Sequence, residues 1–185
     1  MTFASMNNLT RTRRLTIIAL AASLCTVTNF LLVPIENVKP MDLIVFVTGY
    51  IAGPSAGAIT GILGWSVYGT MNPNGFNMNV WIATSLGETI YGLAGGFVGR
   101  RFRPKIENRT RDAFLFGVLA GILTLIYDVF TTLVAIFTFG FPVTLSFILA
   151  LPWFVAHEAG NVLIFSSSTI PVLQPLGKIF WRQPS

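Results

Sequence analysis

The chain has 185 residues, of which 53% are hydrophobic and only 10% are charged, and its mean hydropathy is +0.70. Soluble domains carry about 25% charged residues, so this composition excludes an ordinary soluble domain and indicates a membrane protein. The net charge of +5 comes from basic residues beside apolar runs, which favours anionic lipid headgroups over nucleic acid as their neighbours.

Six apolar segments predict six transmembrane helices. The first is close to the ~20 residues that span a bilayer and longer than the core of a signal peptide, so we interpret it as a permanent span. Pro152 is expected to separate an interfacial segment from the last helix proper. External loops are predicted at 34–40 and 71–77 because both are rich in turn residues. The six segments are, in chain order, 15–33, 41–52, 56–70, 78–98, 112–139 and 143–173.

Basic residues predict the orientation of these helices. Eleven of the twelve Lys and Arg residues fall on one side of the threaded membrane, and only Lys39 falls on the other. Cationic loops stay in the cytoplasm during insertion, so both termini are expected there, in the cell membrane of a prokaryote. The predicted fold is an all-α integral membrane bundle that forms one domain over 1–185. Within it, 1–14 is a basic cytoplasmic tail, 15–173 the bundle and 174–185 a second cytoplasmic tail.

Glycines recur at four-residue spacing on the third and fourth predicted helices. Small residues at this spacing let helix backbones approach closely in lipid. We interpret these rows as a packing feature rather than a ligand site. They comprise Gly53, Gly57 and Gly61, then Gly92 and Gly96, and Gly95 and Gly99.

Three carboxylates lie deep in apolar segments, at Glu88, Asp128 and Glu158, and His157 and Asn161 accompany the last of them. An ionisable group near the bilayer centre costs on the order of 2.5–3.5 kcal/mol on insertion scales. At 1.5 Å per residue, Glu88 and Asp128 are both expected roughly 15 Å below the outer surface. An outward-opening polar cavity would explain them. A structural hydrogen-bond network that satisfies itself is the alternative.

Aromatic residues near the outer ends of the helices could contribute to such a cavity. Stacking and cation–π attraction would suit a flat, cationic or amine-bearing solute, and no basic residue is predicted at membrane depth to favour an anion. An interfacial aromatic belt is the alternative interpretation. The candidate stacking residues are Trp65, Tyr68, Trp81 and Trp153.

Patterns for catalysis are weak. Residues 53–57 read G-x-S-x-G but lie at a predicted cytoplasmic turn, far from His157, which is the only histidine. His157-Glu158-x-x-Asn161 resembles a zinc motif that lacks its second histidine. No nucleotide-binding fingerprint is present in the sequence. We therefore expect no catalytic residues, no metal and no cofactor.

Three strings in the first 80 residues carry a resemblance. The chain resembles the substrate-binding S component of an energy-coupling factor (ECF) vitamin transporter. The strings are Pro34-x-x-Asn37-Val38-Lys39-Pro40-Met41-Asp42, Gly53-Pro54-x-x-Gly57-x-x-x-Gly61 and Tyr68-Gly69-x-x-Asn72-Pro73-x-Gly75.

The resemblance implies a high-affinity capture subunit for a vitamin or a related small nitrogenous micronutrient, such as a thiamine-like, pyridoxine-like or deazapurine-like solute. It implies two partners, a transmembrane coupling subunit and a pair of cytoplasmic ATPases, that drive import. The external loops would cover the site. Its contacts would come from Glu88, Asp128, His157 and Asn161, together with the four candidate stacking residues.

Such proteins dock through an Ala-x-x-x-Ala pattern on their first helix. Here the corresponding strings are Ala19-x-x-x-Ser23 and Ala22-x-x-x-Thr26, so Ala19, Ala22 and Ser23 are the expected docking residues. Packing within the bundle is the alternative role for small residues on one helix face.

Other functions stay open on the sequence. A solitary facilitator or proton-coupled carrier would use Glu88 or Asp128 to carry protons. A structural membrane protein would need no small ligand at all. A membrane enzyme would need turnover that depends on the same residues.

Overall fold

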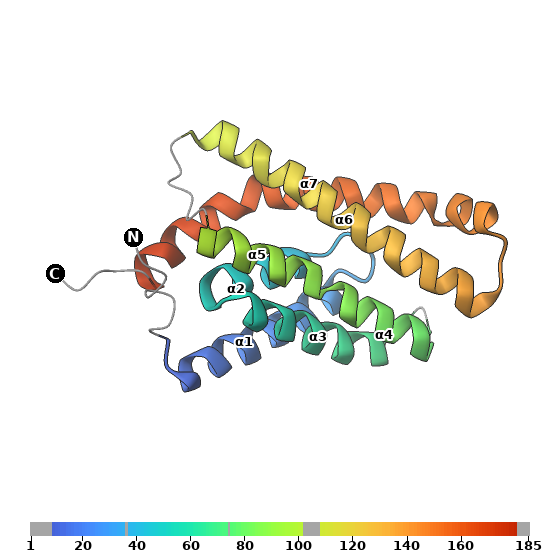
Figure 1. The fold of residues 1–185 in the computed structure, drawn as a ribbon, viewed down its shortest axis with the longest axis horizontal. Helices are drawn as coiled ribbons and strands as arrows, with labels where there is room; N and C mark the ends of the chain where they lie inside the picture. The colour runs from blue at the N-terminus through green and yellow to red at the C-terminus, as the bar shows by residue number, and fades with distance from the viewer. Residues whose placement is uncertain (1–8, 36, 74, 102–107, 181–185) are drawn as a thin grey trace.

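The computed structural model describes residues 9–35, 37–73, 75–101 and 108–180, and these contain seven α-helices and no strand. Helices α4 and α5 are interrupted only at Glu88 and follow one another along one line (Figure 1), so together they form the fourth predicted helix. The prediction of an all-helical bundle is confirmed. The helices are α1 (Arg11–Leu31), α2 (Met41–Ala52), α3 (Pro54–Thr70), α4 (Met78–Gly87), α5 (Thr89–Arg101), α6 (Arg109–Phe139) and α7 (Val143–Phe180).

Side-chain caps set two helix starts that differ from the prediction. Thr10 Oγ1 accepts a hydrogen bond from the Arg13 amide, so α1 begins within the segment expected to be a tail. Asn108 Oδ1 accepts one from the Arg111 amide and starts α6 at Arg109. The range of α2 is as predicted, whereas α7 extends to Phe180, beyond the boundary expected at 173.

The expectation that Pro152 divides the last segment is wrong. Helix α7 is continuous over 38 residues, with Pro152, Pro171 and Pro175 inside it. A proline removes one hydrogen bond from a helix. A break in an apolar environment would leave several backbone groups unpaired, at several kcal/mol each. Continuing the helix is therefore the less costly solution.

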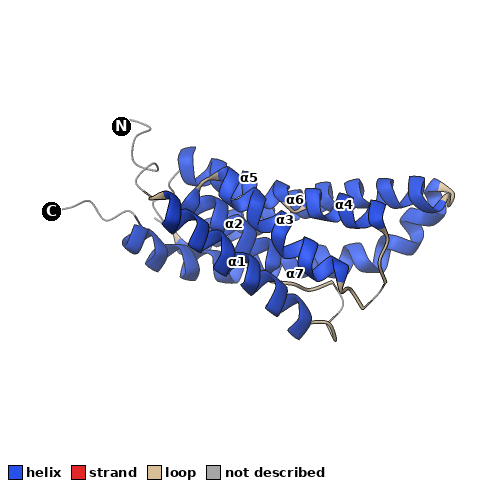
Figure 2. Ribbon diagram, turned by 90° about the horizontal axis from the view of Figure 1, so that it is seen from below, coloured by secondary structure: helices blue, strands red, loops and turns tan. Residues whose placement is uncertain are grey.

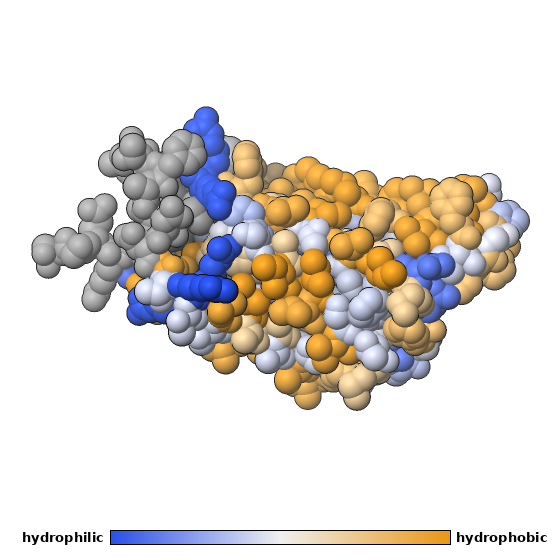
Figure 3. Space-filling model, turned by 60° about the horizontal axis from the view of Figure 1, so that its bottom comes forward, coloured by the Kyte–Doolittle hydropathy of each residue, from blue (hydrophilic) through white to orange (hydrophobic). Residues whose placement is uncertain are grey.

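The outer surface indicates a multi-pass membrane protein. Helices α1, α6 and α7 are each long and apolar enough to cross a membrane. Large apolar side chains face outward, such as Leu20 at 67% and Phe137 at 87% exposure, and hydrophobic surface covers much of the face in Figure 3. Such faces are stable in lipid rather than in water.

Helix α2 lies at the centre of the bundle. Eleven of its twelve residues are buried, and it packs against α1, α3, α5 and α7. The start of α1 and the end of α7 lie at the same end of the molecule (Figure 1). The loops that follow α1 and α3 lie away from that end (Figure 2).

Glycines let α2, α3 and α5 touch at their backbones, as the glycine rows predicted. A Cβ added to Gly49 would lie 2.0 Å from the Gly92 carbonyl oxygen, and one added to Gly57 would lie 2.6 Å from the Gly92 Cα. Gly95 approaches the Phe46 carbonyl oxygen equally closely, at 2.0 Å from a Cβ. No larger residue fits at these crossings without moving a helix.

We predict that Gly92→Ala lowers the thermal stability of the detergent-purified protein, because the new methyl group would overlap the backbone of α3. Overpacking costs typically ~1–3 kcal/mol, which exceeds the gain of about 1 kcal/mol in helix propensity. The matched control is Gly121→Ala, whose Cβ would meet only ordinary contacts at 3.5 Å. Equal melting temperatures for the two variants would contradict the backbone-contact interpretation.

Candidate functional site

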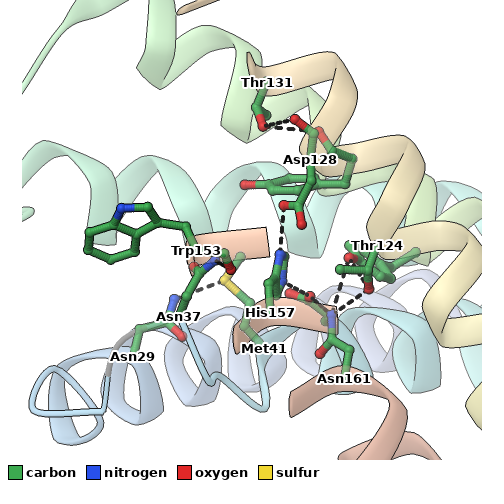
Figure 4. Close-up of polar contacts among 12 residues, drawn as sticks. Asn29, Asn37, Met41, Thr124, Asp128, Thr131, Trp153, His157 and Asn161 are labelled. Atoms are coloured by element: carbon green, nitrogen blue, oxygen red, sulfur yellow. Dashed lines mark hydrogen bonds and ion pairs between the residues drawn. The ribbon is translucent and has the colours of Figure 1, made fainter. Parts of the chain in front are cut away.

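Six buried polar side chains from four helices meet inside the bundle, and we call them the polar cluster (Figure 4). One of these side chains comes from α2, one from α5, two from α6 and two from α7. Asp42 is only 2% exposed and Asn161 only 1%. The polar cluster consists of Asp42, Tyr91, Thr124, Asp128, His157 and Asn161.

His157 bridges two carboxylates at the centre of this cluster. Its Nδ1 lies 2.8 Å from Asp128 Oδ1, and its Nε2 lies 2.9 Å from Asp42 Oδ2. A neutral imidazole has one N–H donor, and an ionised carboxylate has none. Both contacts therefore need one further proton, either on the imidazole or on one of the acids. The bridge joins α2, α6 and α7 through two hydrogen bonds, one of which depends on this further proton.

Asn161 adds a second set of contacts one turn along α7. Its amide nitrogen lies 2.5 Å from Asp42 Oδ2, 2.8 Å from Thr124 Oγ1 and 3.3 Å from the Tyr91 hydroxyl. Tyr91 in turn donates to Thr124 Oγ1 at 3.0 Å. His157 and Asn161 thus share Asp42, which confirms that they lie on one face of the helix.

Several acceptors around the cluster have no donor. Asp128 Oδ2, Asn161 Oδ1 and Glu88 Oε2 are buried, and none has a hydrogen-bond partner in the described part of the chain. A buried polar atom without a partner costs roughly 1–3 kcal/mol, and more when it is charged. The site is therefore rich in acceptors and short of donors.

Glu88 lies at the interruption between α4 and α5, one turn before Tyr91, and is 1% exposed. Its Cβ packs against α3, where a Cβ added to Gly61 would be 2.8 Å away. Its side chain makes no hydrogen bond to the polar cluster among the described residues. The structure therefore places it deep in the bundle, as expected, but not within the bridge.

Glu158, the third carboxylate that the sequence places in an apolar segment, does not join Asp128 in the polar cluster. It is half-buried on α7, with its Oε2 beside Gly121 of α6. It has no hydrogen bond to any described residue. Neighbours in sequence point to different faces of a helix, so His157 turns inward and Glu158 does not.

The sequence analysis missed Asp42 as a member of the site. Asp42 is the second residue of a helix of only twelve residues, which rises about 18 Å, whereas the hydrocarbon core is about 30 Å thick. A helix this short cannot place both of its ends at the membrane surfaces. The short length of this helix is therefore the feature of the sequence that indicates an acid near its start could lie deep in the membrane.

Two of the four candidate stacking residues, Trp65 and Tyr68, contact the ammonium group of Lys39. Lys39 Nζ lies 4.4 Å from the Tyr68 ring centroid and 5.3 Å from that of Trp65, and it donates to the Tyr68 hydroxyl at 3.2 Å. These rings anchor the loop that follows α1.

The other two candidate residues contact loops and neighbouring helices. Trp81 donates through Nε1 to the Ser66 carbonyl oxygen at 3.1 Å, and the Trp153 carbonyl accepts from Asn37 Nδ2 at 2.9 Å. None of the four candidates makes a hydrogen bond to the polar cluster within the described ranges. The ring that packs on His157 is Tyr127, edge to face at 5.6 Å, which the sequence analysis did not select.

Two hollows lie on the loop side of the site. A small pocket of about 50 Å³ is formed where the two loops meet α3 and α7, with Lys39, Tyr68, Pro73 and Trp153 among its walls. A groove of about 360 Å³ runs between α4 and α6. Only the groove falls within the ~300–1,000 Å³ of typical ligand pockets. Its walls are Asn79, Ile82, Ala83, Leu86, Phe130, Val134, Phe137 and Thr138.

Comparison with known proteins gives one match. Residues 13–111, just over half of the chain, match the family described as "ECF transporter, substrate-specific component". No curated protein and no solved structure matches the chain. The matched region spans α1 to α5, so it includes Asp42 and Glu88, whereas Asp128, His157 and Asn161 lie beyond it.

We predict that Asp42→Asn lowers the stability of the protein by roughly 2–3 kcal/mol, because hydrogen bonds to a charged group are worth about that much. The amide would also place an N–H group near Asn161 Nδ2, which already donates there. Thermal unfolding in detergent would measure the loss. Glu158→Gln is the matched control, and an equal loss in that variant would show that the Asp42 contacts are unimportant.

Proposed function

The chain belongs to the family of substrate-specific components of ECF transporters, and we propose that it captures a small cationic or amine-bearing micronutrient of the vitamin type. One observation carries the solute class. At the site, the buried acceptors Asp128 Oδ2, Asn161 Oδ1 and Glu88 Oε2 have no donor among the residues that the structure describes. A solute with N–H groups would supply them.

The charge balance favours the same class. Three carboxylates, Asp42, Asp128 and Glu88, are buried here, whereas His157 is the one basic side chain hydrogen-bonded within the cluster. Lys39 is engaged by the rings of Trp65 and Tyr68. An anionic solute would add repulsion to this arrangement, and a cation would relieve it. The solute would thereby compensate the desolvated acids.

The groove between α4 and α6 suggests a binding space that Tyr127 separates from these acids. Its walls Leu86 and Phe130 are half-exposed and lie two residues along their helices from Glu88 and Asp128, so the acids point away from the groove and toward the interior of the bundle. Tyr127 packs between the groove and the bridge, because a Cβ added to Gly87 would touch its ring at 2.8 Å and its ring also packs on His157. We propose that Tyr127 contacts the solute and that the loops at 34–40 and 71–77 cover it.

Orientation follows from the basic residues. The positive-inside rule supports an orientation with both termini in the cytoplasm of a prokaryotic cell. The groove and Lys39 would then face the outside, where a capture subunit must collect its solute.

Import would be driven by partners, through a coupling subunit and two ATPases. Ala19 and Ser23 face outward on α1 and could form a docking stripe. Ala22 is only 9% exposed and packs within the bundle, so we assign it to packing and not to docking. The docking proposal therefore narrows to Ala19 and Ser23.

A solitary proton-coupled carrier is the second candidate, and the His157 bridge favours it. A proton shared between two acids and an imidazole could be exchanged during transport. Uptake by cells that lack the ATPase subunits would distinguish this candidate from the first.

We predict that the purified protein is stabilised against heat by thiamine or pyridoxine and not by folate, which represents the anionic class. Asp128→Asn should weaken binding of the stabilising solute at least about tenfold, because one charged hydrogen bond is lost. Isothermal titration would measure the affinity, and native mass spectrometry would identify any solute retained through purification.

Glu158→Gln is the control for this experiment, and its affinity should equal that of the wild type. Unfolding curves of each variant without solute would separate a binding defect from a folding defect. If a folded Asp128→Asn variant binds as tightly as the wild type, or if folate is the ligand, the proposed solute class is wrong.

We predict that Ala19→Leu together with Ser23→Leu abolishes co-purification with the coupling subunit, because the bulkier side chains would hold the two helices apart. Solute affinity should not change. Leu24→Phe, at an exposed position on a different side of α1, is the control and should co-purify normally. Unchanged association of the double variant would place the docking surface elsewhere.

A further inference from the structure

The end of the bundle where α1 begins carries a site that the solute does not use. Two guanidinium groups converge there on the turn between α2 and α3. A Cβ added at Gly53 would lie 3.5 Å from Arg100 Nη2 and 4.0 Å from Arg14 Nη2. Arg14 comes from α1 and Arg100 from α5, so this approach is set by tertiary structure.

The two cations have no compensating anion in the described part of the chain. Neither has a carboxylate within ion-pair distance, since Arg111 is the one arginine paired there, with Asp112. Arg14 donates to the Ser55 hydroxyl, but its Nε is buried without a partner. Like charges this close repel one another unless an anion lies between them.

The adjoining start of α3 favours an anion as well. The helix has seventeen residues, begins with Pro54 and has no side-chain cap. Pro54 has no N–H, and the Ala56 and Gly57 amides donate to the Gly53 carbonyl oxygen. The Ser55 amide is therefore the backbone donor that this first turn can offer beside the guanidiniums. Phosphate oxygens would match the two planar donor groups.

An apolar ridge leads away from this position along α3. Ser55, Ile59, Leu63 and Val67 follow at four-residue spacing and are all exposed, so they form one lipid-facing stripe. Strongly hydrophilic surface borders hydrophobic surface at this end in Figure 3. A phospholipid would match this surface, because it has a phosphate group at one end and apolar acyl chains beyond it.

We propose that Arg14, Arg100 and the start of α3 bind the phosphate of an anionic phospholipid, whose acyl chain lies along the ridge. This site is separate from the polar cluster and independent of the proposed solute. It would fix the depth of α1, α3 and α5 at the predicted cytoplasmic surface.

The test is native mass spectrometry of the detergent-purified full chain, titrated with phosphatidylglycerol, phosphatidylcholine or inorganic phosphate. Phosphatidylglycerol should bind most tightly. The variant Arg14→Gln with Arg100→Gln should lose about thirtyfold in its affinity, since each basic group near the surface contributes about a factor of five. Arg13→Gln, an exposed arginine on the same helix, is the matched control and should lose no more than the factor of about five that one basic group near the surface contributes.

Three results would overturn the proposal. The double variant could bind phosphatidylglycerol as tightly as the wild type, Arg13→Gln could lose as much affinity as the double variant, or inorganic phosphate could bind as well as the lipid. Melting curves in phosphatidylcholine would show that the variants are folded. Solute affinity should stay unchanged throughout, so failure here is distinguishable from failure of the solute proposal.

Discussion

The structure depends on one constraint, which is that a charge inside hydrocarbon must find its partner within the protein. The Asp42–His157–Asp128 bridge meets this constraint for three ionisable groups at once. Because none of these groups can turn to water, the start of α2 and the middle of α6 and α7 must lie at the same depth. Asp42 comes two residues after Pro40, so the bridge also draws the preceding loop down into the bundle. The loop that carries Lys39 is thereby held close to α3. The Lys39 ammonium group therefore needs partners at this position, and the rings of Trp65 and Tyr68 supply them.

The rest of the bundle is held by a different interaction. Helices α2, α3 and α5 meet at Gly49, Gly57 and Gly92, where backbone touches backbone and dispersion replaces hydrogen bonding. Because glycine has no side chain, no side chain at these crossings can change its conformation. The polar cluster, in contrast, keeps buried acceptors that have no donor among the described residues, so its hydrogen bonds can be exchanged for others. The glycine crossings therefore form a closely packed frame, and on the proposed function the polar cluster is the half of the molecule that can respond to a solute.

The sequence predicts what depends on local pattern. Apolar runs give the helices, and the limits of α2 follow from Pro40 before it and Gly53 after it. Asp128, His157 and Asn161 are recognisable because they are polar residues within long apolar runs. Asp42 is not recognisable in this way, because its depth comes from how a short helix sits among longer ones. The continuity of α7 through Pro152 depends on the lipid around it, and the engagement of Trp65 and Tyr68 by Lys39 depends on the fold of a loop. Those features depend on tertiary contacts and produce no repeating pattern in the sequence.

The division between frame and responsive half also explains where selectivity for a solute would reside. The family match covers α1 to α5, and therefore covers the glycine-packed frame. On the proposed function, the groups that distinguish one solute from another come mainly from α6 and α7, where Thr124, Asp128, His157 and Asn161 lie. These side chains could change in charge without disturbing any glycine crossing. Asp42 is the exception, because it belongs to the frame by position and to the site by its hydrogen bonds. A change of solute class from cation to anion would therefore have to replace Asp42 or neutralise it, and the helix at the centre of the fold would limit which solutes this scaffold can accept.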